Sequence, residues 1–129
     1  MIGVANIVSA AMLAGTLHAP AQPAWPAVAQ LSLSVHQGQS PGGESIGAAT
    51  LTCHPGGGSH PSPAAACAAL DRAGGQPELV TGRNGVCPMI YNPVTAVAYG
   101  HWGPRPVRFE KTYSNSCVLK DELTPVYDF

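Results

Sequence analysis

Four cysteines are the feature that most constrains the fold of this 129-residue chain, and they stand at Cys53, Cys67, Cys87 and Cys117. In an oxidising compartment an even number of cysteines in a small protein typically forms disulfides, and four cysteines allow three pairings. Sequential pairing would close one short and one medium loop, and each closure would contribute about 3 kcal/mol in the chain-entropy model. The residues alone do not select among the three pairings.

A zinc site is the alternative use of these thiols, because His54 and His60 lie near Cys53 in the sequence. No Cys-x-x-Cys spacing is present, however, and loop histidines of this kind usually face solvent. We therefore expect two disulfides and no metal or other cofactor.

The N-terminus predicts export, which would supply the oxidising compartment. An apolar run over residues 7–17 is too short to span a bilayer as a helix, and small residues at Ala19 and Ala21 suit a signal peptidase. We predict a signal peptide over residues 1–21 and a mature, secreted domain over residues 22–129. Cleavage after Ala29 is the alternative, but it would trim the first strand. Because no Lys or Arg precedes the run, a buried N-terminal helix is the competing interpretation.

Length and charge limit the class of protein. A chain of 129 residues is one domain by its length, with 45% hydrophobic residues to form an interior. The formal net charge is −1 and only 10% of the residues are charged, so no field recruits nucleic acid or an anionic membrane. We expect neither as a partner.

Hydrophobic alternation predicts mostly strands. Apolar side chains alternate over residues 29–35 and 107–113, and further strands are predicted at 46–53, 94–99 and 126–129. Residues 100–104 are predicted to form a hairpin turn.

Two helical segments are expected between and after these strands. Ser62 and Pro63 suit the start of a helix over residues 64–73, Gly74 suits its end, and residues 118–122 suit one helical turn. The order predicts the α+β class, an antiparallel sheet with a helix packed on one face.

The segment from Val86 to Pro93 is unusual because two prolines bracket it. Pro88 has a fixed φ and disfavours helical geometry at Cys87, and Pro93 does the same to Asn92. The segment therefore loses little entropy when it is held extended, which is the form that a protease cleft binds. The competing interpretation makes Met89 and its neighbours ordinary core residues of a strand, and exposure of Met89 distinguishes the two.

Catalytic groups are sparse. No His-Glu-x-x-His motif or phosphate-binding loop occurs, and cysteines in disulfides are not nucleophiles. Asp121 and Glu122 are adjacent, which is typical of a solvated turn, and His101 is typical of a hairpin tip. We predict that the chain is not an enzyme. A small zinc enzyme that uses His54, His60 and His101 is the remaining alternative, and it requires free thiols.

Several segments together resemble the Streptomyces subtilisin inhibitor family of secreted serine protease inhibitors. The resemblance covers roughly the last hundred residues, and the matching segments are Leu51-Thr52-Cys53, His60-Pro61, Ala64-Ala65-Ala66-Cys67-Ala68, Cys87-Pro88-Met89-Ile90-Tyr91-Asn92-Pro93-Val94, Gly100-His101-Trp102-Gly103, Phe109-Glu110-Lys111-Thr112, Ser114-Asn115-Ser116-Cys117 and Phe129. The order of the four cysteines, with a Cys-Pro-Met strand, makes the resemblance specific.

The resemblance implies a fold and a mode of action. The fold would be a five-stranded antiparallel sheet with two short helices, two sequentially paired disulfides and a homodimer. The chain would act on subtilisin-like serine proteases as a tight, slowly cleaved substrate mimic, with Met89–Ile90 as the reactive bond. The residues expected to contact the protease are Gly85, Val86, Cys87, Pro88 and Tyr91.

The residues after and before the bond depart from the usual pattern of the family. Ile90 and Asn92 replace a usual Val and acidic residue, and Arg83-Asn84-Gly85 replaces a commonly acidic stretch. The unbranched Met89 suits a broad apolar pocket and predicts subtilisin-like over trypsin-like targets. The alternative function is a secreted protein of the same fold that docks another exported enzyme, such as a transglutaminase, without inhibiting a protease.

Overall fold

The computed structural model of the chain describes residue 3 and residues 29–129. The predicted signal peptide, residues 1–21, and the alternative N-terminal helix lie outside the described residues apart from Gly3. They stay predictions.

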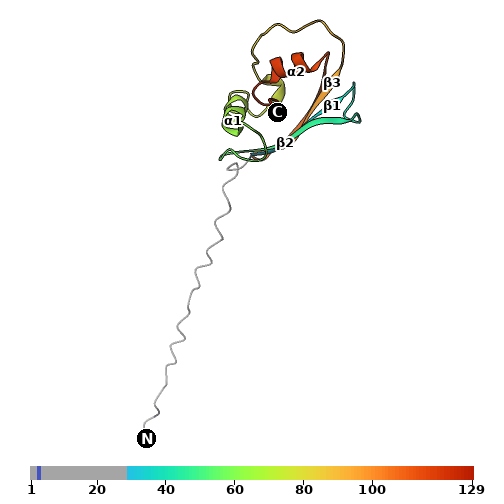
Figure 1. Ribbon diagram of the computed structural model, residues 1–129. Coiled ribbons are helices and arrows are strands. Elements are labelled where there is room, and N and C mark those ends of the chain that lie inside the picture. Colours follow the sequence, from blue (N-terminus) through green and yellow to red (C-terminus); the bar gives the residue numbers. More distant parts are fainter. Residues whose placement is uncertain (1–2, 4–28) are drawn as a thin grey trace.

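An antiparallel sheet forms the larger layer of the molecule (Figure 1). It contains β1 (Ala29–Gln37), β2 (Ser45–Cys53), β3 (Val94–Trp102) and β4 (Arg105–Tyr113), in the spatial order β2-β1-β3-β4. The four long strands predicted from alternation are therefore confirmed. Because β1 pairs with both β2 and β3, the two hairpins form one continuous sheet.

The prediction of a fifth strand is wrong for the part of the chain that the structure describes, because residues 126–129 do not join the sheet. The backbone N–H groups of Val126 and Tyr127 both donate to Leu123 O at the end of a helix, so they are not available to a ladder. The two side chains are buried in the core, and the Tyr127 hydroxyl donates to Val97 O over 2.7 Å. Burial raises the pKa of Tyr127 well above its usual range. This short segment thus contributes Val126 and Tyr127 to the core and not a strand to the sheet.

The β3–β4 turn is tighter than predicted. Strand β3 continues through Gly100 to Trp102, so the turn consists of Gly103 and Pro104, with Gly103 at φ 60°. Position 100 requires glycine, because an added Cβ would lie 2.0 Å from Gln30 O on the neighbouring strand.

Two helices cover one face of the sheet (Figure 1). Helix α1 (Pro63–Arg72) begins after Ser62 and gives way to Gly74 at φ 65°, which confirms its predicted limits. Helix α2 (Ser116–Leu123) has eight residues and is longer than the predicted single turn. A 3-10 turn, η1 (Pro77–Leu79), lies between α1 and β3. Among the described residues, no helix is long and apolar enough to cross a membrane.

The core lies between the sheet and the helices. Leu31 and Leu33 of β1 point inward and are buried, as their alternation predicts. The disulfide Cys53–Cys67 joins β2 to α1, which confirms the first pairing implied by the family resemblance. The interpretation of His60 as a solvent-facing loop residue is wrong, since it is buried and hydrogen bonds to Val126 O over 2.8 Å.

Candidate functional site

A long loop, residues 80–93, connects η1 to β3 and contains the proline-bracketed segment. Val86 and Met89 at its tip are fully exposed, and Ile90 and Tyr91 are more than half exposed. The interpretation of Met89 as a core residue is therefore wrong. Consecutive apolar side chains held out in water are typical of an interaction site.

The disulfide Cys87–Cys117 anchors this loop to the first turn of α2, with Cα atoms 5.8 Å apart. It confirms the second sequential pairing. The bridge joins the chain before the Met89–Ile90 bond to the chain after it, so cutting that bond leaves both ends in one covalent molecule.

Asn115 supports the loop from inside. Its side chain is only 7% exposed, and its Nδ2 donates to Pro88 O over 3.1 Å and to Ile90 O over 2.8 Å. Its Oδ1 accepts from Val118 N over 3.0 Å and so caps α2. One buried amide thus fixes the carbonyls on either side of Met89 relative to a helix end.

The arm that leads into the tip is held by Asp121 of α2. Arg83 N donates to the Asp121 backbone oxygen over 2.9 Å, and Gly85 N donates to its Oδ1 over 2.8 Å. This close approach requires glycine at position 82, where an added Cβ would lie 2.0 Å from Asp121 O. Asn84 between them adopts φ 56°, a conformation that asparagine tolerates better than most residues.

The arm that leaves the tip is tied to the end of β4 and to the β1–β2 turn. Asn92 N donates to Ser114 O over 2.8 Å, next to the cap residue Asn115. From the other side, Gly38 N donates to Pro93 O over 2.8 Å. The exposed tip is therefore short, and both of its ends are fixed.

The structure brings all the residues predicted to contact a protease into this one loop. They are Gly85, Val86, Cys87, Pro88, Met89, Ile90 and Tyr91. Sequence reasoning assigned no role to Asn115, although an asparagine directly before a helical segment is a signal for a cap. It also interpreted Asp121 as a solvated turn residue, because nothing in the sequence pairs Asp121 with Gly85.

Residues 29–129 contain no group of three or more His, Cys, Asp or Glu side chains that could hold a metal ion. All four cysteines are in disulfides, so the zinc alternative, which requires free thiols, is wrong. His54 pairs with Asp71 over 2.9 Å and His60 with a backbone oxygen, so the two histidines serve separate local contacts. Burial, and secondly the Glu122 carboxylate, raise the pKa of Tyr113 to about 12, which keeps this phenol neutral.

The family model and the similar proteins found by comparison all point to one family. Residues 27–115 match the family model described as subtilisin inhibitor-like. Subtilisin inhibitor-like protein 1 of Streptomyces cacaoi is 43% identical over 103 residues, which cover 75% of this chain and 92% of that protein. The subtilisin inhibitor of Streptomyces albogriseolus is 39% identical over 84 residues, covering 64% of this chain and 58% of that protein.

A solved structure shares the fold. Sermetstatin of Streptomyces caespitosus, crystallised in complex with Bacillus licheniformis subtilisin, superposes with a TM-score of 0.68 at 36% sequence identity. The match covers 79% of this chain and 99% of that one.

Proposed function

The chain belongs to the subtilisin inhibitor-like family, and on this premise we propose that it inhibits subtilisin-type serine proteases with Met89–Ile90 as the reactive bond. It is a protease inhibitor and not an enzyme. Two features of Met89 support the choice of this bond. Its apolar side chain is fully exposed, and Asn115 holds the carbonyl groups on either side of it.

Binding would use a loop that is already in the bound shape. Pro88, the anchored Cys87 and the Asn115 bonds remove most of the ordering cost that a free peptide would meet. The main chain around Val86 and Cys87 would pair with an edge of the protease by β-augmentation. Gly85 N already donates to Asp121, so Gly85 would contribute its carbonyl to that pairing.

Met89 would supply the specificity. Burying a methionine side chain fully in an apolar pocket contributes roughly 1.5–3 kcal/mol, and its flexible, unbranched chain adapts to a broad pocket. Tyr91, exposed on the other side of the bond, would contact the protease beyond Ile90.

Inhibition in place of digestion would follow from retention of both products. After attack on Met89, the acyl group stays on the protease and the new amine belongs to Ile90. The Cys87–Cys117 bridge and the fixed arms keep this amine close, at an effective concentration far above that of a free peptide. Resynthesis of the bond then competes with attack by water, so cleavage is slow and reversible.

Titration of subtilisin tests this function against the alternative, a docking protein of the same fold. Residual protease activity should fall linearly and reach zero near one equivalent of chain. Met89→Ala should weaken inhibition at least tenfold, since it removes most of the buried apolar side chain. The matched control is Leu79→Ala, an exposed apolar residue outside the loop, which should change nothing. A complex that leaves the protease active would favour the docking function and refute the inhibitor.

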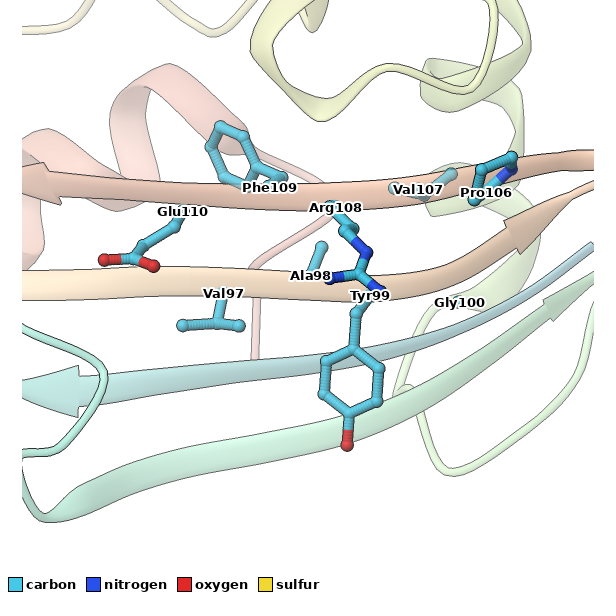
Figure 2. A pocket seen from close by; sticks show the side chains of 9 residues that line it. All are labelled: Val97, Ala98, Tyr99, Gly100, Pro106, Val107, Arg108, Phe109 and Glu110. Atoms are coloured by element: carbon cyan, nitrogen blue, oxygen red, sulfur yellow. The ribbon is translucent and has the colours of Figure 1, made fainter.

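We further propose that the chain is a homodimer that uses the sheet face turned away from the helices. Tyr99 of β3 is more than half exposed there and lies opposite Arg108 of β4. Val97 and Glu110 form the next cross-strand pair on the same face, two residues away (Figure 2). These residues border a shallow hollow of about 610 Å³. A two-fold axis over this face would allow Arg108 of each copy to meet Glu110 of the other, around an apolar centre.

Sedimentation of the purified protein tests the dimer. Tyr99→Arg would place a second positive charge beside Arg108 and should give monomers, whereas Leu79→Arg on η1 should leave the dimer intact. Wild-type protein that sediments as a monomer at micromolar concentration would refute the proposed interface. Secretion is proposed as well, because the predicted signal peptide agrees with a target among extracellular proteases, and N-terminal sequencing of the exported protein tests it.

A further inference from the structure

Gln37, the last residue of β1, and Gln39 of the β1–β2 turn reach the arm of the loop that follows the Met89–Ile90 bond. Gln37 Nε2 donates to Asn92 Oδ1 over 2.7 Å and also lies 3.4 Å from Pro93 O. Gln39 Nε2 donates to the Tyr91 hydroxyl. The two glutamines thus contact three successive residues on the leaving-group side of the bond.

The backbone that carries these glutamines is itself rigidly placed. Gly38 N donates to Pro93 O over 2.8 Å, and Thr95 Oγ1 donates to Gly38 O over 2.9 Å, so the turn is tied to the start of β3. Gly43 lies at the end of the turn and packs so closely on β1 that an added Cβ would lie 1.8 Å from Gln37 O. The glutamine side chains therefore extend from a fixed backbone.

Neighbouring residues hold the backbone of this arm, and the glutamines hold its side chains. Asn115 fixes the Ile90 carbonyl and Ser114 O fixes the Asn92 amide, but both act from the α2 side. From the β1–β2 side, Gly38 N restrains Pro93 O, and the glutamines extend this restraint to Tyr91 and Asn92, which lie nearer the Met89–Ile90 bond. The disulfide keeps the two cleaved ends in one molecule, but it joins the chain at Cys87 and Cys117 and so does not itself contact Tyr91 or Asn92.

Building on the proposed function, we propose that Gln37 and Gln39 are positioning residues for the inhibitory reaction. They hold Tyr91 and Asn92 so that, once the Met89–Ile90 bond is broken, the Ile90 amine stays where it can attack the acyl group on Met89 again. The acyl bond to the protease breaks as the peptide bond reforms, so no further reactant is needed. The glutamines act through Tyr91 and Asn92 and do not touch the reacting atoms.

The equilibrium between intact and nicked inhibitor measures this role. With a catalytic amount of subtilisin, the ratio of nicked to intact chain in the double variant Gln37→Ala/Gln39→Ala should rise about tenfold over wild type, as expected for two lost hydrogen bonds of modest net strength. The matched control is Ser40→Ala, an exposed residue of the same turn, which should leave the ratio unchanged. An unchanged ratio in the double variant overturns the proposal.

Two further measurements keep the test independent of folding and of the protease. Tyr91→Phe removes the partner of Gln39, so its effect and that of Gln39→Ala should be less than additive. In the free protein, hydrogen exchange of the Asn92 amide should accelerate about tenfold in the double glutamine variant, and no acceleration would overturn the role of the glutamines. A wild-type chain that fails to inhibit subtilisin would instead overturn the proposed function, while the exchange result still decides the placement of the arm.

Discussion

Replacement of Asn115 is the sharpest test of how the loop is stiffened. Asn115→Ser keeps a side-chain oxygen that can cap α2, since serine and asparagine are comparable caps. The shorter serine cannot reach Pro88 O and Ile90 O, which Asn115 Nδ2 holds at 3.1 and 2.8 Å. The variant thus separates support of the loop from support of the helix.

The expected magnitude follows from the two lost bonds. At about 1 kcal/mol net for each, the loop loses about 2 kcal/mol of preorganisation, which corresponds to roughly 30-fold weaker inhibition. The free energy of unfolding should fall less than in Asn115→Ala, which also loses the cap, worth about 1 kcal/mol.

Inhibition constants for subtilisin, measured by competition with a chromogenic substrate at fixed salt and pH, check this expectation. Denaturant unfolding of the same variants separates loop effects from global ones. Ser116→Ala, the exposed neighbour of Asn115, is the control and should match wild type in both assays. If Asn115→Ser inhibits within about threefold of wild type, the buried amide does not stiffen the loop and the reasoning is refuted.

Further expectations concern the tip, its anchors and the core. Met89→Lys should improve inhibition of trypsin at least tenfold, because a cationic side chain suits a pocket with an acidic floor, and an unchanged target spectrum in parallel titrations would contradict the assignment of Met89. Oxidation of Met89 to the sulfoxide should weaken subtilisin inhibition about tenfold, since an apolar pocket must then desolvate a polar oxygen, and equal potency after oxidation confirmed by mass spectrometry would point to another loop. Asp121→Ala should weaken inhibition about fivefold by freeing Gly85 N, with Asp121→Asn restoring most of it through the amide oxygen, and equal potency of all three proteins would show that this arm needs no anchor. The free energy of unfolding should fall as the pH rises above about 10, because Tyr113 and Tyr127 have raised pKa values in the folded state and ionise first in the unfolded chain; the slope is about 1.4 kcal/mol per pH unit per tyrosine, and a flat profile to pH 12 would contradict their burial.

Features that depend on local pattern were predictable from the sequence. The alternation of Leu31, Leu33 and Val35 reports burial on one face of a strand, and Ser62-Pro63 with Gly74 marks the ends of α1. The prolines at 88 and 93 predicted an extended loop, because they restrict backbone angles within a few residues.

Features that depend on distant partners were not predictable. Asp121 meets Gly85 across 36 positions and Asn115 meets Ile90 across 25, and neither pair has a local signature. The segment 126–129 was misassigned because its three apolar residues suit an edge strand or burial in the core equally well, and only the course of the chain after α2 decides between them.

The position of the cut tests the central claim most directly. The protein is incubated with a catalytic amount of subtilisin, and its intact mass is measured before and after reduction of the disulfides. The account predicts a single product heavier by one water molecule, which separates into two fragments only after reduction, with ends at Met89 and Ile90. A cut at any other bond, or fragments that separate without reduction, would contradict it.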